Sequence, residues 1–102
     1  PHRFGDFLFD GEAGWIREGR EKRWFLVGAS LLAKDGAILF TCNERVEWVE
    51  IGFRDGILEV CSDTFHQMTI WNPEAREIRF NGTPTAFVRS GNYAITLRGE
   101  NK

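Results

Sequence analysis

The chain has 102 residues, enough for one domain with one core, and 42% of them are hydrophobic, which excludes wholesale disorder. Thirteen basic and fifteen acidic residues are interspersed, and the net charge is −2. This balance argues against a dedicated nucleic-acid binder, which needs a basic surface, and no segment approaches the roughly 20 apolar residues that span a membrane. The sequence shows no signal peptide and does not begin with methionine, so we expect a processed protein or an excised domain.

Turn-forming pairs recur along the chain and leave short apolar runs between them. They are Asp10-Gly11, Asp35-Gly36, Asp55-Gly56, Asn72-Pro73, Asn81-Gly82 and Gly91-Asn92. A spacing of about nine residues from turn to turn is typical of an all-β sandwich or barrel. We therefore predict an all-β fold, an antiparallel β-sandwich of about 8–10 short strands that ends in a β-meander.

The first part of the chain contains three predicted strand regions and one predicted loop. The strands are Phe4–Phe9, then Arg23–Val27 with Ser30–Ala33 as one strand broken at Gly28, and then Ala37–Thr41. Residues 12–23 carry seven charges, and Gly14 and Gly19 interrupt any helical pattern there. We predict that residues 12–23 form a charged surface loop, which Trp15 and Ile16 attach to the core.

The second part of the chain is predicted to consist of hairpins. The strands are Val46–Phe53, Ile57–Ser62, His66–Trp71, Arg76–Phe80, Thr85–Val88 and Tyr93–Leu97. Asn-Gly between alternating apolar residues is a strong hairpin signal, because a type I′ turn needs positive φ at both central residues. Side-chain alternation then directs six residues of the closing strands into the core, namely Ile78, Phe80, Phe87, Tyr93, Ile95 and Leu97.

Residues that could carry catalysis or bind metal are scarce. His66 shares a strand face with Met68 and Ile70, which favours a structural histidine. The sequence contains none of the spacings typical of zinc sites, nucleophilic serines or phosphate loops, so we predict no catalytic residue, metal or cofactor. Cys42 and Cys61 lie in apolar segments, which favours buried free thiols, and a disulfide between them remains the alternative in an oxidising compartment.

Four tryptophans in 102 residues give the clearest indication of binding. Each of them has a position in the strand alternation, or neighbours in the sequence, that fit partial exposure. They are Trp15, Trp24, Trp48 and Trp71. A partly exposed indole surrounded by polar groups can stack on the flat face of a sugar, whose hydroxyls then bond to those groups. The alternative is that these tryptophans cover the sheet or contact a neighbouring domain.

Eight residues near the C-terminus follow one pattern of aromatic residues and turns: Trp71, Pro73, Ile78, Asn81, Gly82, Phe87, Gly91 and Tyr93. Together with the strand pair around Lys34-Asp35-Gly36, they make the region Arg23–Leu97 resemble a known domain. This is the small C-terminal β-sandwich of heparinase II/III-like polysaccharide lyases and related carbohydrate-active enzymes. In that family the elimination chemistry resides in other domains, so none of its catalytic residues can be placed on this sequence.

The resemblance implies an accessory, non-catalytic module of a polysaccharide-degrading enzyme, in a periplasmic or extracellular location. Such a module supports the catalytic domain or binds glycan weakly, and its expected partners are a polysaccharide or that domain rather than nucleic acid or membrane. The alternative function is a structural or protein-interaction module without a ligand, in which exposed tryptophans form a docking surface.

Overall fold

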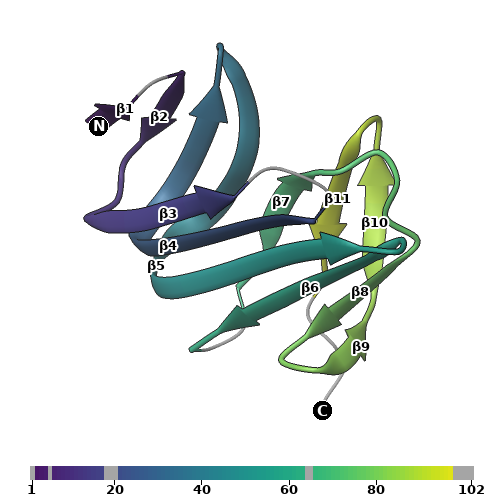
Figure 1. Ribbon diagram of the computed structural model, residues 1–102. Helices are drawn as coiled ribbons and strands as arrows, with labels where there is room; N and C mark the ends of the chain where they lie inside the picture. The colour runs from purple at the N-terminus through teal and green to yellow at the C-terminus, as the bar shows by residue number, and fades with distance from the viewer. Residues whose placement is uncertain (1, 5, 18–20, 64–65, 98–102) are drawn as a thin grey trace.

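The computed structural model describes residues 2–4, 6–17, 21–63 and 66–97, and within these ranges the protein is all-β and has no helix (Figure 1). The all-β prediction is therefore confirmed. The strands are β1 (His2–Phe4), β2 (Phe7–Phe9), β3 (Ala13–Arg17), β4 (Lys22–Lys34), β5 (Ala37–Arg54), β6 (Ile57–Ser62), β7 (Met68–Trp71), β8 (Glu77–Phe80), β9 (Thr83–Thr85), β10 (Phe87–Ser90) and β11 (Tyr93–Thr96).

All these strands belong to one hydrogen-bonded sheet that curls on itself. Its main path runs β1-β2-β4-β5-β6-β8-β9, while β3 pairs with β4, and β7 connects β5 to β11 and β10. The sheet is nearly closed and barrel-like, so the predicted sandwich is not confirmed. The physical reason is that β4 and β5, with 13 and 18 residues, each run through both halves of the sheet instead of ending at its edge.

A sharp bend in β4 allows this curling. Gly28 takes a φ of +65°, and the sheet register shifts just after it, between Ala29 and Leu31. The Asp10 carboxylate accepts hydrogen bonds there from the backbone N–H groups of Ser30 and Leu31, at 2.8 and 2.9 Å. The predicted break at Gly28 is thus a bend within a continuous strand, and Asp10 replaces the neighbouring strand where the pairing is interrupted.

Three of the predicted turns have the geometry expected of type I′ hairpins. Both central residues have positive φ in Asp35-Gly36, Asp55-Gly56 and Asn81-Gly82. The hairpin between Val46–Phe53 and Ile57–Ser62 is confirmed, since β5 and β6 pair antiparallel across Asp55-Gly56. The strand predicted at Phe4–Phe9 is instead two strands, β1 and β2, which pair with each other.

The surface loop predicted for residues 12–23 is wrong for Ala13–Arg17, which form β3 and pair with β4 over their whole length. The glycine that argued against a helix suits a strand here. A Cβ on Gly14 would lie 2.4 Å from the carbonyl oxygen of Phe25, so glycine lets β3 approach β4 this closely.

The predicted β-meander at the C-terminus is also wrong. Within the described residues β9 and β10 do not pair with each other; β8 runs parallel to β6, and β11 pairs with β7. The phase of β11 differs from the prediction, because Ala94 and Thr96 are buried while Ile95 is only half-buried. The Thr96 hydroxyl accepts a hydrogen bond from the N–H of Met68 at 2.9 Å, which satisfies this polar group inside the core.

The core fills the concave side of the curled sheet. Its largest fully buried side chains are Phe40, Leu26, Leu32, Leu58, Met68, Ile70, Ile78, Val46, Val49, Val60 and Thr96. Of the residues predicted for the core, Ile78 is fully buried, and Phe80 and Phe87 pack partly buried against the core. Tyr93 and Leu97 are half-buried, like Ile95.

Candidate functional site

The four candidate tryptophans lie on two different faces of the sheet. Trp24 is 6% exposed and, with half-buried Trp71, lines a groove on the concave side. Trp15 is 45% exposed and lies on the convex side, where Trp48 is half-buried on β5. The structure therefore brings Trp24 and Trp71 together and separates them from the other two.

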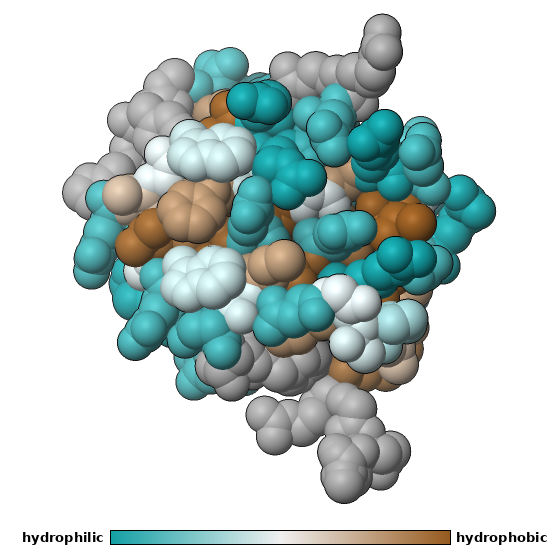
Figure 2. Space-filling view, turned by 60° about the horizontal axis from the view of Figure 1, so that its bottom comes forward, coloured by the Kyte–Doolittle hydropathy of each residue, from teal (hydrophilic) through white to brown (hydrophobic). Residues whose placement is uncertain are grey.

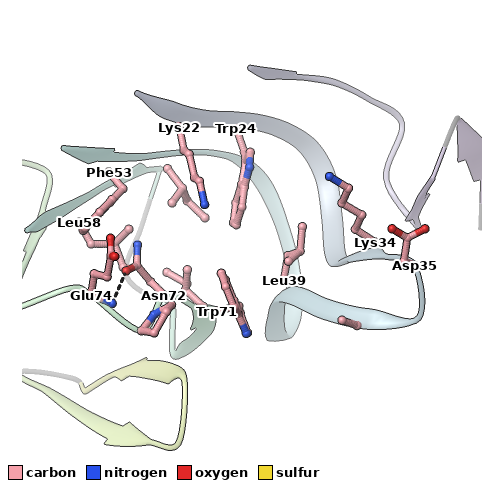
Figure 3. A pocket seen from close by; sticks show the side chains of 14 residues that line it. Lys22, Trp24, Lys34, Asp35, Leu39, Phe53, Leu58, Trp71, Asn72 and Glu74 are labelled. Carbon is pink, nitrogen blue, oxygen red and sulfur yellow. Dashed lines mark hydrogen bonds between the residues drawn. The ribbon is translucent and has the colours of Figure 1, made fainter. Parts of the chain in front are cut away.

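The groove has a volume of about 510 Å³, within the range of sites that hold small organic ligands. It is lined by Lys22, Trp24, Lys34, Asp35, Ala37, Leu39, Ile51, Phe53, Leu58, Ile70, Trp71, Asn72, Pro73 and Glu74. Figure 3 shows Trp24 and Trp71 extending from opposite sides of the cavity, one from β4 and the other from β7. The walls are mainly apolar, and the charged side chains come from strand ends and turns.

A lysine reaches into the groove next to the tryptophans. Lys22, the first residue of β4, points into the cavity in Figure 3, and its Nζ lies 5.8 Å from the centre of the Trp71 ring. A cation at this distance is attracted by the negative face of an indole. The Trp71 ring is thus held from one side, and Lys22 places a positive charge and three hydrogen-bond donors beside the apolar wall.

The opposite rim of the groove is a tight turn after β7. The side-chain oxygen of Asn72 accepts a hydrogen bond from the N–H of Glu74 at 3.0 Å, and the N–H of Asn72 donates to the carbonyl oxygen of Asn92. These bonds fix the turn, and Figure 3 shows the side chains of Asn72 and Glu74 beside the cavity. The rim therefore offers an amide and a carboxylate at fixed positions.

The indole Nε1 of Trp24 is buried and has no hydrogen-bond partner among the described residues. An unsatisfied buried donor costs about 1–3 kcal/mol, so its presence is unusual in a well-packed sheet. Sequence reasoning could not have found this feature, because it depends on how β3 and β5 flank Trp24 on either side of β4.

The convex face of β3, β4 and β5 carries a second aromatic cluster, which we call the outer patch: Trp15, Phe25, Val27 and Trp48. The rings of Trp15 and Phe25 stack with centres 6.1 Å apart, and Val27 lies opposite Trp48 in the sheet. Figure 2 shows this face, where pale and brown side chains lie together among teal charged ones.

Charges border the outer patch on one side. Arg23 Nη1 donates a hydrogen bond of 3.0 Å to Glu50 Oε2, and this bond raises the pKa of the Arg23 guanidinium. Glu21 lies 3.6 Å from the same arginine. The outer patch is therefore an apolar surface with a charged border, unlike the concave groove with its polar rim.

His66 is buried, as are Met68 and Ile70, with which it was predicted to share a strand face. Its side chain is 6% exposed, its Nδ1 lies 2.8 Å from Glu44 Oε2, and its Nε2 lies 3.9 Å from Asp63 Oδ1. Its carbonyl oxygen accepts a bond from the Thr96 hydroxyl. Within the described ranges no group of three or more His, Cys, Asp and Glu side chains is arranged so that it could hold a metal ion.

Cys42 and Cys61 are free thiols. Cys42 belongs to the core cluster, whereas Cys61 is half-buried and pairs across the sheet with Glu50 on the convex face. Burial raises the pKa of both thiols, and for Cys61 the negative charges of Glu50 and Glu59 add to the effect. High thiol pKa values disfavour nucleophilic chemistry at these positions.

Comparisons of the chain with protein-family models, curated proteins and solved structures found no match. Among the described residues, no helix is long and apolar enough to span a membrane. Function therefore has to be argued from the groove and the outer patch themselves.

Proposed function

We propose that this chain is a non-catalytic β-module that binds a glycan in the groove between Trp24 and Trp71. The observation that carries this proposal is the meeting of these two tryptophans, 47 positions apart in the sequence, in one groove of about 510 Å³. The C-terminal pattern that resembles accessory domains of polysaccharide lyases is consistent with the same function.

The groove combines the two elements that sugar recognition needs. The C–H faces of a pyranose ring are apolar and pack on indole and aliphatic side chains, whereas its hydroxyls lie at the edge of the ring and require polar partners. In the groove Trp71 provides the first element, and Lys22, Asn72 and Glu74 provide the second. Because these polar groups are few, the proposed affinity is weak, as suits a module that assists a catalytic domain.

The experiment is a calorimetric titration of the protein with heparin fragments, alginate oligosaccharides and neutral glucan oligosaccharides. We expect saturable binding of at least one class, and we expect Trp71→Ala to weaken that binding by tenfold or more. Trp15→Ala is the matched control, because it removes the same side chain from the convex face and leaves the groove intact.

Two further measurements make the result decisive. Thermal unfolding of each variant shows whether Trp71→Ala is folded, and Lys22→Gln tests the polar rim without removing apolar surface. Absence of heat at millimolar sugar for all three classes would overturn the proposal, as would equal losses of affinity from Trp71→Ala and Trp15→Ala.

A second candidate function, a protein-interaction module, is favoured by the outer patch. Surface apolar residues are normally scattered rather than gathered, and an apolar cluster that includes a 45% exposed tryptophan is typical of a contact surface. This function and glycan binding use opposite faces of the sheet, so each can be tested without disturbing the other.

A further inference from the structure

The turn between β7 and β8 forms one side of the groove but belongs to no strand. It supplies three consecutive residues of the groove lining, namely Asn72, Pro73 and Glu74. A proline at the second position, and an asparagine side chain that bonds to the N–H two residues later, are typical of such turns. The local sequence therefore gives the turn its shape, whereas its orientation against the groove depends on contacts from other parts of the chain.

Arg89 of β10 binds this turn at both ends. Its Nη1 donates a hydrogen bond of 2.8 Å to the carbonyl oxygen of Asn72, and its Nη2 donates one of 2.5 Å to the carbonyl oxygen of Ala75. Both acceptors belong to buried residues, since Asn72 is 8% exposed and Ala75 is 5% exposed. A guanidinium is a planar fork whose donors have fixed directions, and it can therefore hold two carbonyl groups in one relative position.

The side chain of Arg89 reaches the turn across β11. Arg89 lies opposite Ala94 of β11, and Ala94 lies opposite Ile70 of β7. Residues opposite each other in a sheet point to the same face, so these three form one row, in which alanine is the smallest member. The N–H of Asn72 also donates to the carbonyl oxygen of Asn92, between β10 and β11. Among the described residues the groove lining includes none from β10 or β11, so this hairpin acts on the groove through the turn.

We propose that Arg89 is a positioning residue for ligand binding in the groove. By holding the carbonyl groups of Asn72 and Ala75, it fixes the turn in the orientation in which Asn72 Oδ1 accepts the N–H of Glu74. The Asn72 amide and the Glu74 carboxylate are then presented at fixed positions, and a ligand does not have to order them when it binds. The inference rests on the proposed glycan function and names the residue outside the groove on which the polar rim depends.

Calorimetric titration of Arg89 variants with the glycan that binds tests the effect on affinity. Arg89→Gln releases both carbonyl groups and should weaken binding by about tenfold, because the rim must then be ordered by the ligand. Arg89→Lys keeps the charge but not the fork, so we expect an intermediate loss. Arg76→Gln is the matched control, since Arg76 Nη2 donates to the carbonyl oxygen of Asp55, which lies outside the groove lining. Thermal unfolding of each variant establishes that it is folded.

A double-mutant cycle separates positioning of the rim from a general loss of stability. Glu74→Gln alone should weaken glycan binding, because it alters the carboxylate of the rim. If Arg89 acts through the turn, the same change should have little effect in the Arg89→Gln background, where the rim is already out of place. A merely structural role of Arg89 would give additive losses instead.

Hydrogen exchange measured by NMR tests the turn without any ligand. The N–H of Glu74 is bonded to the Asn72 side chain, and this bond slows its exchange with solvent. We expect Arg89→Gln to accelerate the exchange of this N–H by about threefold or more, and Arg76→Gln to leave it nearly unchanged.

Three outcomes would overturn the inference. They are unchanged exchange of the Glu74 N–H in Arg89→Gln, equal losses of affinity from Arg89→Gln and Arg76→Gln, and additive losses in the double-mutant cycle. Failure of the glycan proposal itself gives a different result: the unmodified protein then binds none of the three glycan classes, while the exchange of the Glu74 N–H still responds to Arg89→Gln. That result would support the positioning of the turn by Arg89 and contradict glycan as the ligand.

Discussion

The concave groove and the convex outer patch contain the same kind of side chain in opposite situations. Two successive residues of β4 illustrate the contrast: Trp24 faces inward and is 6% exposed, while Phe25 faces outward and stacks on Trp15. Successive residues of a strand point to opposite faces, so a shift of one position decides between core and surface.

The two faces also differ in how charge is used. In the groove Lys22 lies over the ring of Trp71, so a cation and an aromatic wall form a single surface. On the convex face Arg23 pairs with Glu50, and this ion pair borders the aromatic cluster without covering it. A concave site with charge inside suits a small polar ligand, and a convex apolar surface with charge at its border suits a protein.

The largest expected effect is the loss of stability in Trp24→Ala. Removing a buried indole leaves a cavity, and such changes cost about 3–5 kcal/mol of unfolding free energy. Trp15→Ala on the convex face should cost less than about 1 kcal/mol, because the side chain is 45% exposed. Urea denaturation of both variants measures the difference, and equal losses would break the contrast between the faces.

An intermediate loss of stability is expected when Asp10 is replaced, because its carboxylate holds the bend in β4 that makes one face of the sheet concave. Burial alone would raise its pKa, but hydrogen bonds from Ser30 and Leu31 and the charge of Arg45 outweigh burial and lower the pKa below its usual value. Asp10→Ala leaves the part-buried backbone donors of Ser30 and Leu31 without their partner and should cost about 1–3 kcal/mol in urea denaturation.

The lowered pKa of Asp10 also sets the direction of a pH effect. The carboxylate contributes stability that is complete above the pKa of the unfolded chain and is lost as the pH falls through the lower folded value. Stability of the native protein should therefore decline as the pH falls below the pKa of an aspartate in the unfolded chain, and Asp10→Asn should remove part of that decline. An unchanged pH profile in Asp10→Asn would show that the bend is held by other groups.

The smallest effect is expected from the ion pair on the convex face. Arg23 and Glu50 side chains are each 34% exposed, and exposed pairs of this kind contribute less than about 1 kcal/mol. A double-mutant cycle with Arg23→Ala and Glu50→Ala measures the coupling, which should decrease at high salt. A coupling above about 2 kcal/mol would show that this border is less solvated than its exposure indicates.

Much of the fold could be predicted because its signals are local. The Asp-Gly and Asn-Gly turns at Asp35, Asp55 and Asn81 are recognisable from residue pairs alone, and their positive φ angles agree. The strand at Ala13–Arg17 could not be predicted in the same way, because its pairing with β4 depends on a close approach at Gly14 that only a neighbouring strand reveals. The phase predicted for β11 is wrong for a similar reason, since Thr96 is buried with partners supplied by His66 and Met68.

The candidate site shows the same division. Tryptophan count and spacing are enough to select four residues, but not to sort them between two faces. Lys22, Leu39 and Phe53 were missed altogether, because nothing in their immediate sequence distinguishes a groove wall from an ordinary strand position. The sequence shows only that these three residues alternate with neighbours that face outward, and this assigns them to the inner face of the sheet without identifying a groove.

The sequence by itself determined the all-β class, the hairpin turns and the supply of aromatic side chains, because turn geometry and strand alternation depend on neighbouring residues. Only the tertiary structure decided that the sheet curls into a barrel-like form, that Trp24 meets Trp71, and that β3 is left with an open edge among the described strands. These features depend on which strands pair and where β4 bends, and contacts between residues far apart in the chain leave no local signal.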